Sequence, residues 1–222
     1  SLGAKKIKFL GNLKFSESKT QKNSALNKNI EKIFKSRKIW CAVSTHNGEE
    51  KICAEAHQKL KKKYKKLLTV IIPRHVHRVN DIYKEILDMG FKVQIHSKKS
   101  KIKKNTDIYL VDTYGETKSF FKICNIVFLG GSIVNHGGQN PLEPARLGCK
   151  ILHGPNIQNF TEVYRLLNKE NLSFKFYNTN QLAKSVNQSL NQNINFAKKI
   201  AKLKKIGSNI LNHTSTEINC FL

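Results

Sequence analysis

LLTVIIP, residues 67–73, contains no charged side chain, although charged residues make up 25% of the whole sequence. A continuous apolar run of this length is typical of a strand that is buried on both faces of a parallel sheet. Helical patterns at 48–64 and 76–90 flank the run, and Gly90 is suited to end the second helix. These residues therefore predict helices packed against a buried parallel strand.

Strand and helix patterns alternate along the rest of the chain. The expected strands are 7–15, 39–45, 67–73, 91–97, 107–112, 125–131, 150–154 and 173–177. The further expected helices are 116–124, 159–170, 180–191 and 194–212, besides a short amphipathic stretch at 30–38. Strands that alternate with helices indicate crossover connections and a parallel sheet. We therefore expect an α/β fold with a doubly wound, Rossmann-like sheet, as a single domain over 1–222.

Composition excludes several classes of protein. The hydrophobic fraction of 39% is typical of a soluble globular protein, and no apolar run approaches the ~20 residues that span a bilayer. The five cysteines are scattered and never spaced as CxxC. This pattern argues against a disulfide framework or a zinc site and favours a reducing cytosolic compartment. The chain opens without a methionine, and we expect it to be a piece of a longer protein.

The net charge is +25, because 40 Lys and Arg face 15 Asp and Glu. Such an excess favours an anionic partner, such as nucleic acid, a phosphorylated ligand or an acidic membrane surface. Lysines cluster at 59–66, 98–104 and 197–205. A generally basic composition explains the same excess, since these lysines also suit solvated helix faces and loops. The sequence has no zinc-finger, RNP-like or basic-zipper pattern, so nucleic acid is not the expected partner.

The segments that follow the strands are the least ordinary parts of the sequence. They read STHNGEE (44–50), PRHVHR (73–78), DTYGE (112–116), GGSIVNHGGQNPLEPA (130–145) and HGPNIQNF (153–160). Doubly wound folds bind ligands outside the carboxyl ends of their strands, where these segments would lie. A simpler interpretation of the first segment has Ser44 or Thr45 capping a helix. The recurrence of such segments at one edge of the sheet nevertheless indicates a binding site.

Residues 130–145 hold four of the twelve glycines and two of the four prolines. The glycines at 130–131 allow the backbone to approach a ligand closely, and those at 137–138 allow a positive φ. Pro141 suits the first position of a helix, whose free N–H groups attract an anion. Glu143 would repel a phosphate but can accept hydrogen bonds from two ribose hydroxyls. Together they predict a nucleotide site, without a P-loop or a dinucleotide fingerprint.

These segments, together with GNLKF (11–15), resemble the motifs of bacterial 3-deoxy-D-manno-octulosonic acid (Kdo) transferases, in the same order, over about residues 7–170. The resemblance implies the C-terminal, donor-binding domain of a GT-B type glycosyltransferase that is inverting and metal-independent. Residues 1–36 would be the lead-in from a missing N-terminal acceptor domain. Gln139 departs from the family, in which His is common at that position.

The resemblance also implies an activity. Family members transfer Kdo from CMP-Kdo to a lipid A precursor in lipopolysaccharide synthesis, on the cytoplasmic side of the bacterial inner membrane. The catalytic base belongs to the missing half, so we expect this soluble fragment of a Kdo transferase to be inactive alone. The expected partners are CMP-Kdo, a lipid A precursor through the missing half, and an anionic membrane surface. The clusters at 59–66 and 98–104 are the expected membrane side.

Individual site residues follow from the same resemblance. The implied nucleotide-binding residues are Arg74, His75, Gly115, Glu116, Thr117, Asn140, Pro141, Leu142 and Glu143. Lys14 is the implied transition-state stabiliser, because a fixed cation favours the charge that the leaving CMP gains. Further donor contacts are expected from Ser44, Thr45, Gly131 and Ser132. No metal or other cofactor is expected, since Lys14, Arg74 and a helix N-terminus can take the place of Mg²⁺.

Two other hypotheses remain open. The first is another nucleotide-sugar enzyme of the same architecture, either an epimerase or an N-acetylglucosamine transferase. Binding of CMP compared with UDP would separate it from a Kdo transferase. The second is a basic module without catalysis that binds nucleic acid or a membrane surface, for which binding to duplex nucleic acid would fall steeply with salt.

Overall fold

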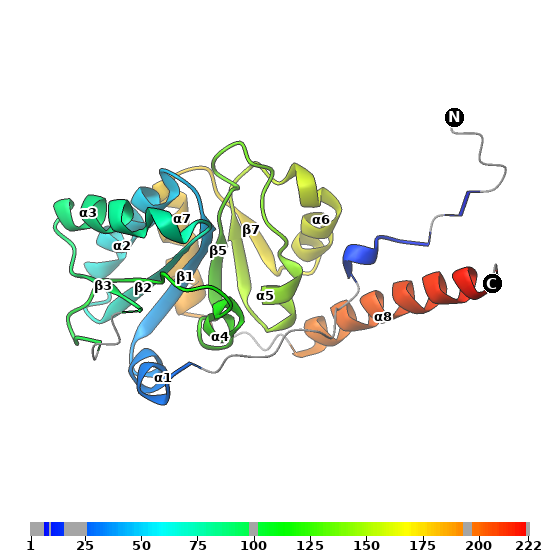
Figure 1. Cartoon of the computed structure of the whole chain (residues 1–222), viewed down its shortest axis with the longest axis horizontal. Helices are drawn as coiled ribbons and strands as arrows, with labels where there is room; N and C mark the ends of the chain where they lie inside the picture. The colour runs from blue at the N-terminus through cyan, green and yellow to red at the C-terminus, as the bar shows by residue number, and fades with distance from the viewer. Residues whose placement is uncertain (1–6, 9, 16–25, 98–101, 193–196, 221–222) are drawn as a thin grey trace. The chain divides into compact units, whose positions relative to one another are not determined.

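The computed structural model describes residues 7–8, 10–15, 26–97, 102–192 and 197–220. The chain forms two compact units, of which the smaller combines 1–22 with 195–222 and the larger is 23–194. The larger unit contains all the described strands (Figure 1). The predicted extent of a single domain, 1–222, is not tested by this division and stays a prediction.

The larger unit is built on a seven-stranded, all-parallel sheet in the order β3-β4-β2-β1-β5-β6-β7. Its strands are β1 (Lys38–Thr45), β2 (Leu67–Pro73), β3 (Val93–Ile95), β4 (Ile108–Leu110), β5 (Ile126–Leu129), β6 (Lys150–His153) and β7 (Ser173–Lys175). Its helices are α1 (Lys28–Lys35), α2 (Glu49–Lys61), α3 (Val79–Asp88), α4 (Thr117–Ile123), α5 (Leu142–Arg146), α6 (Thr161–Lys169) and α7 (Thr179–Leu190), with short 3-10 turns η2 (Val76–Arg78) and η3 (Gln158–Phe160). The predicted doubly wound parallel fold is confirmed.

The order of the strands reverses between β1 and β5. From β1 the chain moves through β2 toward β3 and β4 on one side, and then crosses to β5, which lies on the other side of β1. The loops after β1 and β5 therefore lead away from each other at the carboxyl edge of the sheet. Doubly wound folds bind their ligands at this reversal. The segments 44–50 and 130–141 follow the two strands concerned.

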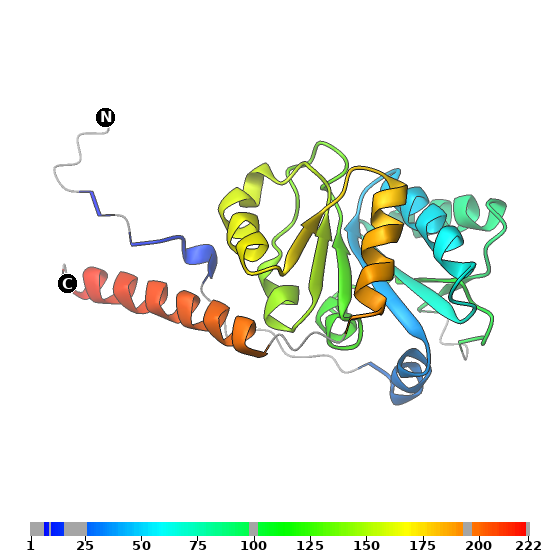
Figure 2. The same cartoon turned by 180° about the vertical axis from the view of Figure 1, so that it is seen from behind.

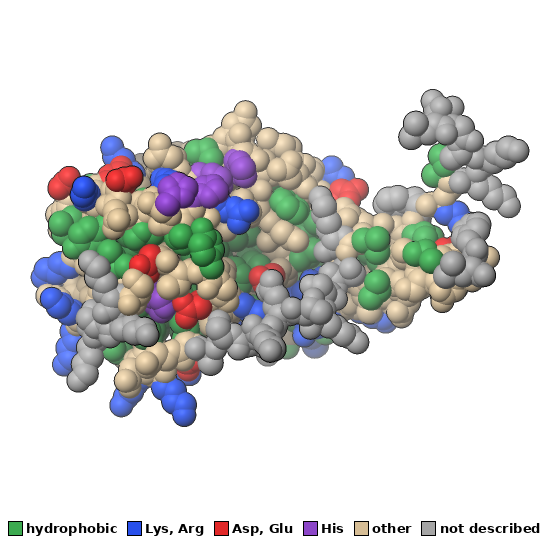
Figure 3. All heavy atoms as spheres, viewed as in Figure 1, with side chains coloured by type: hydrophobic (Ala, Val, Ile, Leu, Met, Phe, Trp, Pro, Cys, Tyr) green, Lys and Arg blue, Asp and Glu red, His purple; other side chains and the backbone are tan. Residues whose placement is uncertain are grey.

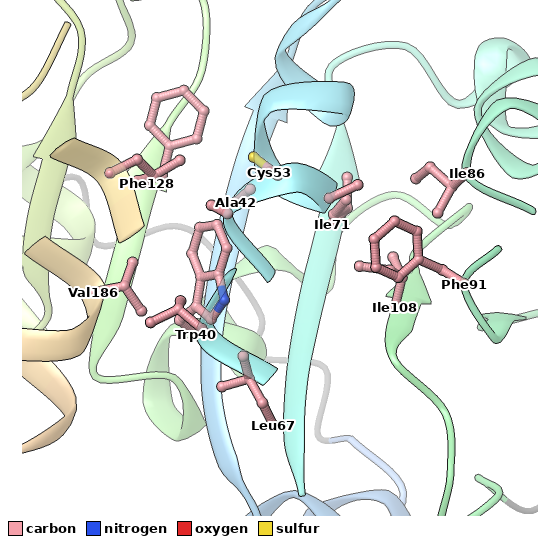
Figure 4. Packing of buried hydrophobic residues seen from close by; sticks show 14 of the residues in the cluster. Trp40, Ala42, Cys53, Leu67, Ile71, Ile86, Phe91, Ile108, Phe128 and Val186 are labelled. Atoms are coloured by element: carbon pink, nitrogen blue, oxygen red, sulfur yellow. The ribbon is translucent and has the colours of Figure 1, made fainter. Parts of the chain in front are cut away.

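Helices cover both faces of this sheet (Figures 1 and 2). On one face α2 packs against α3 and α7, and on the other α4 packs against α1 and α5. Trp40 and Ala42 of β1 belong to the hydrophobic cluster on the α2 side (Figure 4), whereas Tyr109 of β4 packs edge-on against Phe34 of α1. Burial on both faces explains the uninterrupted apolar run of β2, whose residues are all buried.

The smaller unit contains η1 (Leu13–Phe15) and α8 (Ala197–Asn219), which contact each other. The predicted strand over 7–15 is wrong for its described residues. Gly11 has a φ of +106°, far from the extended region, and a Cβ there would lie 2.9 Å from Ile210 of α8. The chain therefore turns against α8 at this point. Among the described residues, no helix combines the length and the apolar character that a bilayer crossing requires.

Candidate functional site

A buried carboxylate joins the two loops at the reversal of the sheet. Glu49, the first residue of α2, is fully buried. Its Oε2 accepts hydrogen bonds from the N–H groups of His46 and Gly131, at 2.9 and 2.8 Å. Its Oε1 accepts from the N–H groups of Ser132 and Ile133, at 3.2 and 3.0 Å. The carboxylate of Glu49 is thus bound by loop N–H groups of the kind that bind phosphate in other doubly wound folds.

Gly130 allows the β5 loop to lie directly against the end of β1. A Cβ at this position would lie 2.4 Å from the carbonyl oxygen of Ser44 and 2.6 Å from Cα of Thr45. Gly130 is therefore required for this close approach of two protein backbones, and its approach to a ligand stays a prediction. Ser44 itself has a φ of +55°, at a point where the pairing of β1 with β2 shifts its register.

A second buried carboxylate fixes the β1 loop to the segment after β2. Glu50 is fully buried and forms a two-point ion pair with Arg78, with N···O distances of 3.0 and 3.2 Å. The hydroxyl of Thr45 donates to Glu50 at 2.8 Å. The interpretation of Ser44 or Thr45 as a helix cap is wrong, since Gly48 occupies the N-cap of α2. The hydroxyl of Thr45 is instead committed to the protein interior.

Arg74 and His75 follow β2 directly and are both exposed. The N–H group of Arg74 donates to the carbonyl oxygen of Thr45 at 3.0 Å, which ties this backbone to the end of β1. The structure therefore brings these two predicted residues to the strand beside the reversal, with their side chains at the surface. A guanidinium there is suited to bind a phosphate through two parallel hydrogen bonds.

Four histidine rings form a row over the carboxyl ends of three strands. His46 follows β1, His75 and His77 follow β2, and His136 belongs to the loop after β5. The ring centroids are 4.2 Å apart for His136 and His46, 6.2 Å for His46 and His75, and 5.5 Å for His75 and His77. Histidine side chains gather on this part of the surface in Figure 3. Burial, reinforced by His136, lowers the pKa of His46.

The segment after β4 contributes a polar cluster to the same edge of the sheet. The carboxylate of Glu116 shares a hydrogen bond of 3.0 Å with His96 and accepts another from the hydroxyl of Thr113. Gly115 is exposed with a φ of +83°, and Thr117 is the first residue of α4. The predicted residues 115–117 thus lie at the carboxyl edge, two strands away from β1.

The predicted residues 140–143 form the entry to α5. The side-chain oxygen of Asn140 accepts a hydrogen bond of 3.0 Å from the N–H group of Leu142. Pro141 was expected at the first position of the helix, but it occupies the N-cap, one position before the first helical residue, Leu142. Leu142 is buried, whereas Glu143 is exposed on the first turn. Glu143 is therefore accessible to a ligand, while the residues before it hold the turn.

The rest of the β5 loop is held by internal bonds. The hydroxyl of Ser132, which is fully buried, donates to the carbonyl oxygen of Leu129 at 2.6 Å and accepts from the N–H group of Gly154 at 2.9 Å. Gly137 and Gly138 have φ angles of +97° and +78°, so the positive φ predicted for both is confirmed. Donor contacts of Ser132 stay a prediction, and its hydroxyl has a structural role here.

Lys14 lies in η1 of the smaller unit, and its side chain is outside the described part of the structure. Its role as a stabiliser of the transition state therefore stays a prediction. Among the described residues, no group of three His, Cys, Asp or Glu side chains is arranged to hold a metal ion.

Sequence reasoning missed the two carboxylates that assemble the site. It gave Glu49, Glu50, His46 and Arg78 no individual part in the site. A signal was present, because the acidic pair begins a helix only three residues after a strand of the reversal ends. A carboxylate at that point has backbone N–H groups on two loops within reach.

Comparison with known proteins identifies relatives of the chain. Over 163 residues, or 73% of its length, it is 34% identical to the 3-deoxy-D-manno-octulosonic acid transferase of Haemophilus influenzae. It is 30% identical over 190 residues, or 86% of this chain, to the enzyme of the same name from Aquifex aeolicus. The chain is a homologue of the Kdo transferases. It spans 38% and 50% of the length of these two relatives. No family model matches it.

A solved structure supports the fold. The chain superposes on the C-terminal CMP-Kdo binding domain of WaaA from Acinetobacter baumannii with a TM-score of 0.68 and 24% sequence identity. The match covers 80% of this chain and 91% of that domain. The predicted Rossmann-like fold class is therefore confirmed for this Kdo transferase homologue, and the domain that it resembles is a C-terminal one.

Proposed function

We propose that this chain is the donor-binding domain of a Kdo transferase and that it binds CMP-Kdo. The observation that carries the proposal is its homology to Kdo transferases over most of its length. The carboxyl edge of the sheet supports it, since Arg74 and His75 are exposed beside the reversal and Glu143 is exposed at the entry to α5. Arg74 and His75 are suited to bind a phosphate, and Glu143 is suited to bind a ribose.

The engagement of Glu49 limits how the phosphate is bound in this proposal. The N–H groups of 131–133 already donate to Glu49, so the phosphate depends on other donors. Arg74, which follows β2 beside the reversal, is a strong donor. The N–H groups of 115–117 are further proposed donors, because they lie at the start of α4. When the bond between Kdo and phosphate breaks, the leaving CMP gains negative charge. Arg74, with Lys14 as a further proposed cation, would stabilise that charge.

Transfer to an acceptor belongs to the longer protein in this proposal. The acceptor would be a lipid A precursor, and the base that activates it would come from the part of the protein outside this chain. The protein would act in lipopolysaccharide synthesis at the cytoplasmic face of the bacterial inner membrane, without a metal or another cofactor.

An anionic membrane surface is the further partner in this proposal. The lysines within 62–66 are exposed and precede β2, so they lie at the amino edge of the sheet, opposite the carboxyl edge. Lys61 differs from them, because its Nζ lies 2.5 Å from the buried carboxylate of Asp107. Of the second predicted cluster, 103–104 is exposed and 98–101 lies outside the described residues. Lys59, the lysines of 62–66, and the pair at 103–104 are therefore exposed for lipid contact in this proposal.

Binding of CMP in preference to UDP is the first expected result. Calorimetric titration of the chain with CMP should give saturable binding, whereas UDP should bind at least about tenfold more weakly. The chain alone should transfer no Kdo, because loss of a general base alone costs about 10²–10⁴-fold in rate. Tighter binding of UDP would favour the alternative nucleotide-sugar enzyme, and binding of neither would contradict the proposed function.

Glu143→Ala should weaken CMP binding about tenfold or more and leave binding of 2′,3′-dideoxy-CMP unchanged. The reason is that a hydrogen bond to a charged group contributes about 1.5–3 kcal/mol, and the dideoxy compound lacks both hydroxyls. Glu162→Ala is the matched control, because Glu162 is likewise exposed at the second position of its helix, α6. Equal losses for both nucleotides would show that Glu143 does not bind the ribose.

A further inference from the structure

One ring nitrogen at the reversal of the sheet has no hydrogen-bond partner within the described part of the chain. Nε2 of His46 is buried and makes no hydrogen bond to any described residue. Buried polar atoms in native proteins are nearly always paired, so an unpaired one needs an explanation. This nitrogen lies on the loop after β1, at the edge where doubly wound folds bind their ligands.

The backbone of His46 is held firmly in place. Its N–H group donates to Oε2 of Glu49 at 2.9 Å, and its carbonyl oxygen accepts from the N–H group of Glu49 at 3.0 Å. Because Glu49 also holds three N–H groups of the β5 loop, the backbone of His46 is fixed relative to both loops. Such fixation is what a residue that positions a ligand requires.

The unpaired nitrogen is covered by a side chain from the surface. The ring of His136 lies over that of His46, with 4.2 Å between centroids and 37° between planes. A Cβ on Gly131 would lie 3.1 Å from Cδ2 of His136 and 3.2 Å from Nε2 of His46, so the backbone of Gly131 also lies close to both rings. His136 is exposed, unlike the residues beneath it. A shift of the His136 side chain is therefore the simplest way to uncover Nε2.

We propose that His46 donates a hydrogen bond from Nε2 to the phosphate of the bound nucleotide, at the place that His136 covers in this structure. The proposal rests on the proposed function. Arg74 and His75 follow the adjacent strand and would approach the same phosphate. The two neighbouring carboxylates do not oppose an anion strongly, since Glu49 accepts four N–H bonds and Glu50 is paired with Arg78.

Two ligands and two variants test this assignment on the full chain. His46→Gln should weaken binding of CMP by at least about tenfold, while binding of cytidine, which lacks the phosphate, should change less than about twofold. His77→Gln is the control, because it removes an exposed ring from the same row without touching His46. It should leave both affinities within about twofold. Equal losses for CMP and cytidine in His46→Gln, or no loss for CMP, would overturn the proposal.

A measurement on the unchanged chain keeps the test valid if His46→Gln does not fold. In spectra of the ¹⁵N-labelled histidine rings, CMP should shift the Nε2 signal of His46 and cytidine should not. An unmoved signal at saturating CMP would overturn the proposal while leaving the proposed function intact. If the chain does not bind CMP at all, the proposed function fails, and this inference fails with it.

Discussion

Glu49→Gln is expected to lower the free energy of unfolding by about 3–5 kcal/mol, because it removes a buried charge and leaves some of its hydrogen-bond donors without an acceptor. The carboxylate accepts four backbone hydrogen bonds, two at each oxygen. A glutamine amide has one oxygen, so two N–H groups lose their acceptor and face the N–H groups of the amide. The two loops at the reversal of the sheet would separate, and CMP binding should weaken as well.

Chemical denaturation of the two proteins, followed by circular dichroism, measures this effect. Glu55→Gln is the matched control, since Glu55 lies on the same helix and its carboxylate accepts a hydrogen bond of 3.0 Å from the hydroxyl of Thr179. Its cost should stay near 1 kcal/mol, the usual net value for one hydrogen bond. Comparable costs for the two variants would contradict the central role that we assign to Glu49.

Gly130→Ala is expected to lower the free energy of unfolding by about 3 kcal/mol or more, at the upper end of the range for overpacking. The added Cβ would lie 2.4 Å from the carbonyl oxygen of Ser44, 2.6 Å from Cα of Thr45 and 2.7 Å from Oε2 of Glu49. Two of these atoms belong to the backbone at the end of β1, which no side-chain rotation can move. The loop after β5 would therefore move outward and strain its bonds to Glu49.

Gly90→Ala separates this clash from the ordinary cost of replacing glycine. Gly90 has a φ of +85°, but a Cβ there meets no atom within 4 Å, so only the left-handed backbone conformation opposes the alanine. That conformation costs about 1–2 kcal/mol in a residue other than glycine. Thermal and denaturant unfolding of both variants gives the comparison. A smaller effect at Gly130 than at Gly90 would show that the loops tolerate separation.

The repeating pattern of the sequence was sufficient to predict the sheet and its helices. The apolar run at 67–73 became β2, and the helical pattern at 48–64 became α2. Such patterns are local, because the spacing of apolar residues along a helix or strand indicates whether one or both of its faces are buried. The strand predicted over 7–15 was wrong for the same reason, since alternation alone does not show that a neighbouring strand exists.

By itself, the sequence determined a doubly wound parallel fold, unusual segments at the carboxyl edge, and a resemblance to Kdo transferases. Only the tertiary structure decided which residues of those segments face each other. Gly130 is spaced like a ligand-binding glycine, yet it admits the end of β1. Glu49 looks like an ordinary first residue of a helix, yet it joins two loops that are 82 or more positions apart in the chain. Hydrogen bonds of this kind depend on distances between strands that pair far apart in sequence, and no local pattern encodes those distances.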